Sequence, residues 1–534
     1  MKLKKGYKYI FLLIPLLIVT GFDSFDYATE PQTRQTEIIV PYVENEWWLI
    51  KWSDYNNVCR IYIDHEGVPN SDDIVVYCGE SAFQEWLKTK PCEPAIKGLE
   101  TSSCSGLYLH KVASEASEKT ILVELPLPTA WISIIDCDLS QTINRCKELP
   151  NILITGEEPL PNESIIRVEG TYNEIPFLCE ASECLLPIRP TSKDGIEIEF
   201  WVDSSFGDTS EHFKAQIRVT DGGVSSGPDS GGWIIDYIGD HWLQGEATQG
   251  CKEIWGAFEP INGLPIWLDS PDWAVLLSTD EPLMFLAGRL IERGIVYADE
   301  CTGGGLQENG YSSQCGLEKA RVEVEEWQNQ FDDQIVEVSQ STGIPAQLMK
   351  NLFALESQFW PGAYRDSDEY GFGQLTEIGA DTILLWNRTF FNQFCPLVLS
   401  KETCDLGYPQ IQEDDQEILR SALAITASSN CPDCPASIDL EHADNSIELF
   451  AQTILANCKQ VGQIITNVSG KSPGQVASYV DLWKFTLANY HAGPGCLSNA
   501  ISNTTGNIIT WEDIIDDLEA DCPGTQQYVG EIVK

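Results

Sequence analysis

One glutamate of this sequence lies where a surface carboxylate is not expected. Segment 343–361 predicts a helix of about four turns, because Pro345 suits a first helical turn and Pro361 ends the helix. Its apolar residues recur at helical spacing and make one stripe: Leu348, Leu352, Leu355 and Phe359. Glu356 falls inside this stripe, and a carboxylate held among apolar side chains has a raised pKa that suits a general acid. The other interpretation is a glutamate at the helix edge whose carboxylate reaches water.

Two stretches further along the chain carry groups that could join this glutamate. The first is Tyr370-Gly-Phe-Gly-Gln-Leu-Thr376 and the second is Asn489-Tyr-His-Ala-Gly-Pro-Gly495. With Glu356-Ser357 before them, the C-terminal third resembles the lysozyme-like catalytic domain of soluble lytic transglycosylases, which cleave peptidoglycan. That family carries a Glu-Ser pair on a helix, then a Gly-x-x-Gln turn, then an Ala-Tyr-Asn-Ala-Gly run. The resemblance covers about residues 318 to 530.

The resemblance implies a reaction that needs one carboxylate and no cofactor. Glu356 would protonate the glycosidic oxygen between N-acetylmuramic acid and N-acetylglucosamine, and would then take the proton of the sugar's own 6-hydroxyl. The product ends in a 1,6-anhydro sugar, and no water enters. The resemblance also implies substrate-binding residues: Ser357, Gly371, Gly373, Gln374, Tyr490 and His491.

The implied roles of these residues differ. Ser357 and Gln374 would orient the substrate or the carboxylate, and Tyr490 would bind near the acid. The two glycines would let the backbone approach the sugar where a Cβ would intrude. The sequence departs from the family pattern at two positions, because His491 replaces Asn and Asn489 replaces Ala. These departures concern the substrate contacts near position 491 rather than the chemistry.

Two other functions fit the same residues. A hydrolase similar to goose-type lysozymes would use water and a second carboxylate, for which the sequence offers Asp366, Asp368, Glu369 and Glu377. A non-catalytic glycan-binding or structural protein of the cell surface is the third possibility. It would be favoured if Glu356 were solvated and distant from Gln374 and Tyr490.

Neither of two metal-like motifs predicts a metal site. Segment 366–377 imitates a calcium loop, but Tyr370 stands where an oxygen ligand is needed. Cys431-Pro-Asp-Cys434 has the spacing of half a zinc site, yet no second pair accompanies it. We therefore expect a structural disulfide there and no metal.

Composition and charge limit the partners and the location of the protein. The formal net charge of −48 argues against nucleic acid and against anionic membrane surfaces. Four lysines precede the apolar run Tyr9–Val19, which is typical of a secretory signal. Residues 1–21 are therefore expected to be a signal peptide, or a membrane tether if they are not cleaved. Either case predicts an extracytoplasmic protein, secreted or held in the cell envelope.

The cysteines support export. Eighteen cysteines favour up to nine disulfides, which form in oxidising compartments. Eleven of them lie between Cys59 and Cys315 and seven between Cys395 and Cys522, so complete pairing requires a bridge between the two sets. The simplest solution gives Cys315 to the C-terminal domain.

The length of 534 residues allows several domains, and the patterning predicts β modules followed by an α-dominated domain. In the first module we expect a strand at Ile74–Cys78 and a short helix at Ser81–Lys88. We regard the many tryptophans between 233 and 273 as core residues rather than sugar platforms. Possible cell-surface partners would bind the β modules. The expected domains are a disulfide-stapled β module (36–106), an immunoglobulin-like sandwich (107–221), a linker (222–232), a mixed Trp-rich module (233–310) and the lysozyme-like domain (315–534).

Seven helices are expected in the last domain, apart from shorter elements. Their ranges are 318–340, 343–361, 383–394, 414–428, 446–461, 472–488 and 511–518.

Overall fold

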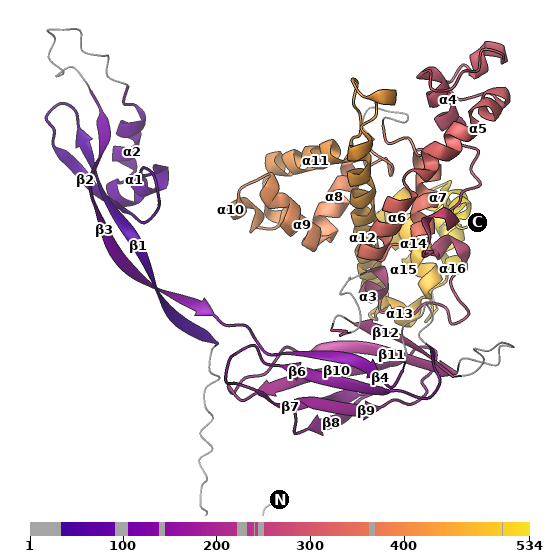
Figure 1. Ribbon diagram of the computed structural model, residues 1–534, viewed down its shortest axis with the longest axis horizontal. Helices are drawn as coiled ribbons and strands as arrows, with labels where there is room; N and C mark the ends of the chain where they lie inside the picture. The colour runs from indigo at the N-terminus through magenta and orange to yellow at the C-terminus, as the bar shows by residue number, and fades with distance from the viewer. Residues whose placement is uncertain are drawn as a thin grey trace, which may run out of the picture. The chain divides into compact units, whose positions relative to one another are not determined.

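The computed structural model has antiparallel β-sheets in its N-terminal part and a helical C-terminal region, as the sequence predicts (Figure 1). It describes residues 34–90, 105–137, 145–221, 232–239, 241–243, 250–362, 369–504 and 506–534. The expected signal segment 1–21 and nearly all of the expected linker 222–232 lie outside these ranges. The chain divides into two compact units, of which the first holds residues up to Leu127 with segments 158–164 and 204–208. Each unit is described by itself.

The first unit is built on a long antiparallel ladder. Strand β1 (Gln35–Lys51) pairs with β3 (Leu107–Glu124) over its whole length, and β2 (Asn57–Ile63) pairs with the second half of β1. The expected boundary at residue 106 is therefore corrected, because β3 belongs to the first module. The pattern of a single strand does not show which distant strand it pairs with.

Two short helices cover this ladder, and one of them replaces an expected strand. Helix α1 (Ser71–Cys78) contains the β-branched residues that predicted the strand. Asn70 caps it, since its side chain accepts hydrogen bonds from the backbone of Asp72 and Asp73, while the Asp73 carboxylate accepts from the Asn70 backbone. This capping box decides in favour of a helix. Helix α2 (Glu80–Leu87) lies where a helix was expected.

A β-sandwich follows in the second unit. One sheet has the order β4-β6-β9 and the other β5-β12-β11-β10-β7-β8. Residues of both sheets share one core, with Ile132, Ile154, Ile198, Phe200 and Ile217 fully buried. The strands are β4 (Thr129–Ile135), β5 (Arg145–Cys146), β6 (Asn151–Glu157), β7 (Ile165–Tyr172), β8 (Ile175–Cys179), β9 (Glu183–Pro187), β10 (Ile196–Ser204), β11 (Phe213–Asp221) and β12 (Trp233–Gly239). The sandwich thus begins later than residue 107 and takes a strand from beyond the linker.

The helical part begins at α3, earlier than expected. Its first helices are α3 (Cys251–Trp255), α4 (Met284–Glu292), α5 (Gln314–Asn329), α6 (Asp332–Thr342), α7 (Ala346–Glu356), α8 (Glu377–Trp386), α9 (Arg388–Phe394), α10 (Lys401–Cys404) and α11 (Glu413–Ala427). The others are α12 (Leu440–Ser469), α13 (Pro473–Val476), α14 (Tyr479–Ala492), α15 (Pro494–Ser502), α16 (Trp511–Asp521) and α17 (Thr525–Ile532). Short 3-10 turns lie at 266–268, 274–276, 302–305, 395–397, 408–410 and 435–437. Helix α12 runs through the middle, with α8 and α11 on one side and α14 and α15 on the other (Figure 1).

The expected Trp-rich module 233–310 is not separate. Its strand β12 completes the sandwich, whereas its helices share the core of the helical part. Trp255 is fully buried and donates a hydrogen bond of 2.9 Å to the carbonyl of Cys458. Trp267 is also core, while Trp273 is 72% exposed. Most of this segment therefore supports the helical core.

The expected helix 318–340 is two helices, because a buried ion pair occupies the break. Lys350, on α7, is fully buried and its Nζ lies 2.5 Å from Oδ1 of Asp332, the first residue of α6. The same Nζ donates to the carbonyl of Gln328 and to Asn329 at the end of α5. Lys350 thus satisfies hydrogen-bond acceptors in the last turn of α5, so the helix can end there.

Eight disulfides form within the described part of the chain, which indicates an oxidising, extracytoplasmic environment. Cys92 and Cys104 lie outside it. The bridge between the two cysteine sets is Cys251–Cys458, and Cys315 pairs with Cys301, so the expected use of Cys315 as the bridge was wrong. The structural disulfide expected at Cys431–Cys434 is confirmed. The remaining pairs are Cys59–Cys78, Cys137–Cys146, Cys179–Cys184, Cys395–Cys404 and Cys496–Cys522.

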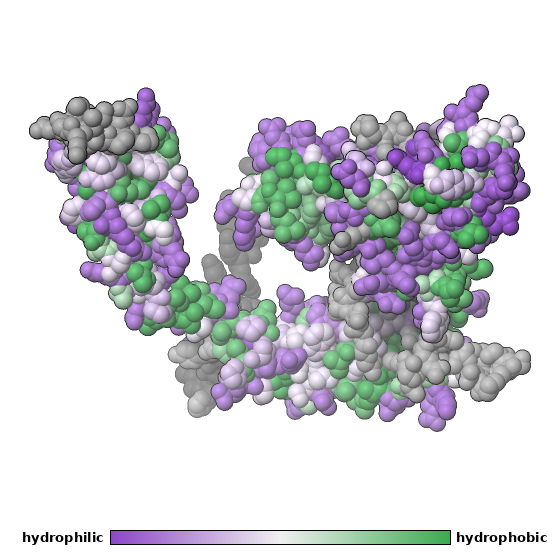
Figure 2. Space-filling model, turned by 45° about the horizontal axis from the view of Figure 1, so that its top comes forward, coloured by the Kyte–Doolittle hydropathy of each residue, from purple (hydrophilic) through white to green (hydrophobic). Residues whose placement is uncertain are grey.

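The face of the helical part that Figure 2 shows is mostly polar. In Figure 2 purple side chains cover much of its visible face, with green apolar side chains gathered in smaller areas between them. This agrees with the net charge of −48. Of the helices that the structure describes, none is both long enough and apolar enough to span a bilayer.

Candidate active site

Glu356 is the last residue of α7, and the chain turns sharply after it. The backbones of Gln358 and Phe359 are left-handed, with φ of 49° and 57°, and the amide of Phe359 bonds to the carbonyl of Phe353 at 3.1 Å. This arrangement ends the helix about one turn before the expected stop at Pro361. Phe359 and Trp360 become core residues instead of helix residues. Glu356 is half-buried at the edge of that core, as the apolar stripe predicted.

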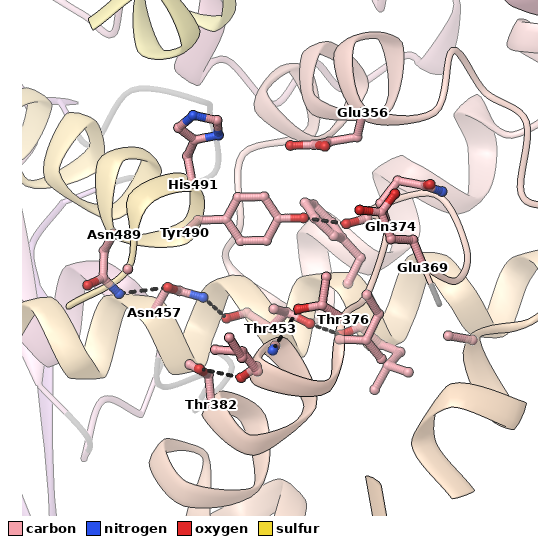
Figure 3. Close-up of a pocket in the computed structure, with 18 of the residues that line it drawn as sticks. Glu356, Glu369, Gln374, Thr376, Thr382, Thr453, Asn457, Asn489, Tyr490 and His491 are labelled. Carbon is pink, nitrogen blue, oxygen red and sulfur yellow. Dashed lines mark hydrogen bonds between the residues drawn. The ribbon is translucent and has the colours of Figure 1, made fainter. Parts of the chain in front are cut away.

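A pocket of about 310 Å³ opens beside Glu356. It lies between the end of α7, the glycine-rich turn, α8, α12 and α14 (Figure 3). Residues from all three sequence stretches line it: Glu356, Gly373, Gln374, Asn489, Tyr490 and His491. The condition for a non-catalytic protein, a solvated Glu356 far from Gln374 and Tyr490, is therefore not met.

Tyr528 is one of the site residues that sequence reasoning missed. Its hydroxyl donates a hydrogen bond to Oε1 of Glu356. Burial raises the pKa of the Tyr528 phenol well above its usual value, and the nearby charge of Glu356 raises it further. The hydroxyl therefore remains a donor at any physiological pH. A single tyrosine on the short helix α17 carries no sequence signal that would link it to residue 356.

Tyr490 crosses the pocket and holds the glycine-rich turn. Its hydroxyl donates to the carbonyl of Gly373, with Glu356 lying on one side of the ring (Figure 3). Burial raises its pKa well above the usual value, and the charges of Glu356 and Glu369 add to the shift. Both carboxylates are therefore close enough to affect the Tyr490 hydroxyl electrostatically.

The two glycines of the turn allow it to pack closely against α12. A Cβ at Gly371 would collide with the side chain of Ser446, and its φ of +73° also favours glycine. A Cβ at Gly373 would collide with the ring of Phe450. Both obstacles belong to α12, so the glycines allow the turn to approach that helix. Gly373 lines the pocket, whereas Gly371 does not.

Gln374 and Ser357 face different surroundings. Gln374 lines the pocket, but its Nε2 donates to the carbonyl of Gly371 at 2.7 Å and so fixes its own turn. Ser357 is fully buried away from the pocket, and its hydroxyl donates to the carbonyl of Phe353 at 3.2 Å. Ser357 therefore does not line the pocket, and it stabilises the end of α7 beside Glu356.

Of the second carboxylates considered, Glu369 is the one that the structure brings to the pocket. It is half-buried and lines the same cavity as Glu356 (Figure 3). Glu377 lies outside the lining and pairs with Arg420 at 3.2 Å. Asp366 and Asp368 lie outside the described residues. The described lining contains two carboxylates and no lysine or arginine.

A network of buried amides forms the far end of the pocket. Nδ2 of Asn457 donates to the carbonyl of Thr453 at 2.9 Å, which directs its Oδ1 toward Asn489. Nδ2 of Asn489 then donates to Asn457 and to Gln460, each at 2.7 Å. Asn489 is therefore a structural partner of α12, and the two α12 residues were not expected at the site. Together these groups make a polar wall of uncharged side chains opposite Glu356.

The chain was compared with protein-family models, with curated proteins and with solved structures, and none of the three comparisons finds a match.

Proposed function

We propose that this chain is an extracytoplasmic lytic transglycosylase that cleaves peptidoglycan. One observation carries the proposal: Glu356, the Gly-x-x-Gln turn and Tyr490 line a single pocket, although they are far apart in the sequence. Each motif alone is common in proteins of other functions. Their meeting around one partly buried carboxylate is what an acid catalyst for glycosidic bonds needs.

In the proposed reaction Glu356 acts twice. The protonated carboxyl donates its proton to the glycosidic oxygen, the bond from that oxygen to C1 breaks, and the leaving sugar departs as an alcohol. The resulting carboxylate takes the proton of the 6-hydroxyl of the remaining sugar while its O6 bonds to C1. The products are a 1,6-anhydro end and a free 4-hydroxyl, so no water is consumed. Tyr528 stabilises the carboxylate between the two steps by its hydrogen bond.

The other lining groups suit an uncharged sugar chain. His491, Gln374 and the amide wall supply polar groups without a formal charge at neutral pH. With two carboxylates and no cation in the described lining, the pocket would repel an acidic polymer.

A hydrolase is the second candidate, and Glu369 is the observation that favours it. A carboxylate in the same pocket could activate a water molecule for attack on C1 while Glu356 protonates the leaving oxygen. The product would then be a reducing sugar one water heavier than the anhydro sugar.

The β parts belong to the proposal as accessory modules. The sandwich would be immunoglobulin-like, and with the β1–β3 ladder it would bind wall glycan or proteins of the cell surface. Residues 1–21 would be a cleaved signal or an uncleaved tether.

Mass spectrometry of the products from purified peptidoglycan tests the proposal. The parent protein should release anhydro-ended muropeptides and Glu356→Gln should release none. Glu337→Gln, which changes an exposed glutamate on α6, is the matched control and should behave as the parent. Reducing-end products that vanish in Glu369→Gln would establish the hydrolase instead. No product from the folded parent, with glycan binding retained, would contradict both.

A further inference from the structure

The ring of His491 lies flat on the ring of Tyr528. The ring centroids are 4.0 Å apart and the planes differ by 13°. His491 occupies the last turn of α14, and Tyr528 lies on α17, which packs against α14. The same Tyr528 hydroxyl donates to Glu356. A contact chain therefore runs from His491 through Tyr528 to the candidate acid.

We infer that His491 is a positioning residue, whose ring holds the Tyr528 hydroxyl on the carboxylate of Glu356. This rests on the proposed function of Glu356 and goes beyond it, because it gives His491 a role other than contact with substrate. The asparagine that the resemblance expected at position 491 has no ring and could not supply this contact.

The surroundings of Tyr528 show why a ring partner matters. The hydroxyl oxygen of a tyrosine lies on the axis about which its ring turns, so χ1 sets the position of this oxygen and the plane of the ring sets the direction in which its O–H points. Backbone anchors place the helix: Nδ2 of Asn351 on α7 donates to the carbonyl of Ile532 at 2.8 Å. The disulfide Cys496–Cys522 joins the start of α15 to the residue that ends α16, just before α17. These restraints hold the backbone, while core packing and the flat stack on His491 together hold the ring.

The His491 ring is well suited to this role because it is uncharged near neutral pH. The residue as a whole is exposed, yet the ring face against Tyr528 is shielded, and this burial lowers the pKa of the imidazole. Its titratable neighbours are Tyr490, next in the chain, Tyr528, and Glu356 beyond the phenol. A neutral ring stacks on the phenol without adding a positive charge beside the acid.

The inference makes a statement about Glu356 that needs no substrate. The Tyr528 hydrogen bond favours the ionised carboxyl, so it lowers the pKa of Glu356 relative to the same site without that bond. Removing the ring at position 491 should weaken the bond and raise this pKa. Removing the hydroxyl in Tyr528→Phe should raise it by at least as much.

The experiment compares His491→Ala, His491→Phe and Tyr528→Phe with the parent, using His442→Ala, an exposed histidine at the start of α12, as control. Each protein is assayed for kcat and KM on peptidoglycan, and its Glu356 carboxyl is titrated by NMR. His491→Ala should lower kcat about two- to tenfold, the factor that corresponds to the loss of one aromatic pair, with little change in KM and a raised Glu356 pKa. His491→Phe should regain most of both losses, because it restores the ring and not the ring nitrogens.

Two outcomes would overturn the inference. Equal losses in His491→Ala and His491→Phe, with KM raised in both and the Glu356 pKa unchanged, would make His491 a substrate contact through its nitrogens. If the Glu356 pKa rises in Tyr528→Phe but stays at the parent value in His491→Ala, the His491 ring does not act on the Glu356 carboxyl. If the parent releases no product at all, the proposed function fails, whereas the titrations still decide the positioning.

Discussion

Tyr528 donates a hydrogen bond to Oε1 of Glu356, so a residue of α17 holds the carboxylate at the end of α7. Hydrogen bonds to a charged group contribute about 1.5–3 kcal/mol, which is more than bonds between neutral partners. The ionisation of the Glu356 carboxyl therefore depends on a helix that lies far from Glu356 in the sequence.

Tyr528→Phe should reduce turnover about 10- to 100-fold with a stable fold. It should also change the pH profile. The donor favours the carboxylate, so its removal raises the pKa of Glu356, and the alkaline limb of kcat/KM should move to higher pH. A pH series on purified peptidoglycan measures both effects, and an alkaline limb that stays in place would show that this bond does not act on the ionising group.

Gly373→Ala should destabilise the protein and abolish activity. The new methyl group would overlap the ring of Phe450, and overpacking of this kind costs about 2–3 kcal/mol. The turn would have to leave α12, and the carbonyl that Tyr490 holds would move with it. Thermal unfolding and the product assay should both change.

Gly495→Ala is the matched control for that substitution. A Cβ at Gly495 meets no atom within 4 Å, and the residue lies in the first turn of α15, where alanine suits a helix. Its melting temperature should equal or exceed that of the parent. A loss of stability equal to that of Gly373→Ala would show that position 373 is not specially restricted.

The parts of the site that could be predicted are those with local signals. Glu356 among apolar neighbours, the Gly-x-x-Gln turn and Tyr490 each lie in a short readable motif. Tyr528 could not be found, because its role depends on the docking of α17 against α7 and α14. The burial of Ser357 could not be predicted, because it depends on where α7 ends, and that end is set by two left-handed residues without glycine.

The fold was predictable to a similar degree. Helical periodicity located most helices of the C-terminal part, but not their breaks, which depend on tertiary partners such as Lys350. The pairing of β1 with β3 is a contact between distant segments that alternation alone does not encode. The strand expected at Ile74–Cys78 failed because the cap at Asn70 outweighed three β-branched residues.

The fold should lose stability if one partner of the buried ion pair between Asp332 of α6 and Lys350 of α7 is removed. Burial raises the pKa of Asp332 to about 6, although Lys350 opposes the shift, so this site strongly disfavours charge. Asp332→Asn leaves the Lys350 ammonium buried without a counter-charge and should cost about 3–5 kcal/mol at pH 7. Urea unfolding measures this loss. The double variant Asp332→Asn/Lys350→Met should recover most of it.

The stability that Asp332→Asn loses should depend on pH in one direction. Burial lowers the pKa of Lys350, and without Asp332 this effect is no longer opposed. A lysine whose pKa is lower in the folded than in the unfolded chain favours folding at high pH and opposes it as the pH falls. The destabilisation of Asp332→Asn should therefore be smaller at pH 9.5 than at pH 7. An equal loss at both values would indicate that packing, not charge, is responsible.

Two disulfides of the helical part should differ in what their removal affects. Cys251–Cys458 closes a loop of 207 residues, and its loss should cost about 5 kcal/mol by the entropy of the unfolded chain. Cys496–Cys522 closes only 26 residues, so its loss should lower the free energy of unfolding by about 3.5 kcal/mol.

The bridge Cys496–Cys522, however, joins the segment that follows His491 to the segment that precedes Tyr528. Under conditions where both Cys-to-Ser double variants remain folded, Cys496→Ser/Cys522→Ser should lose more turnover and Cys251→Ser/Cys458→Ser more stability. If turnover instead followed stability in both variants, the smaller bridge would have no specific effect on the contact between Tyr528 and Glu356.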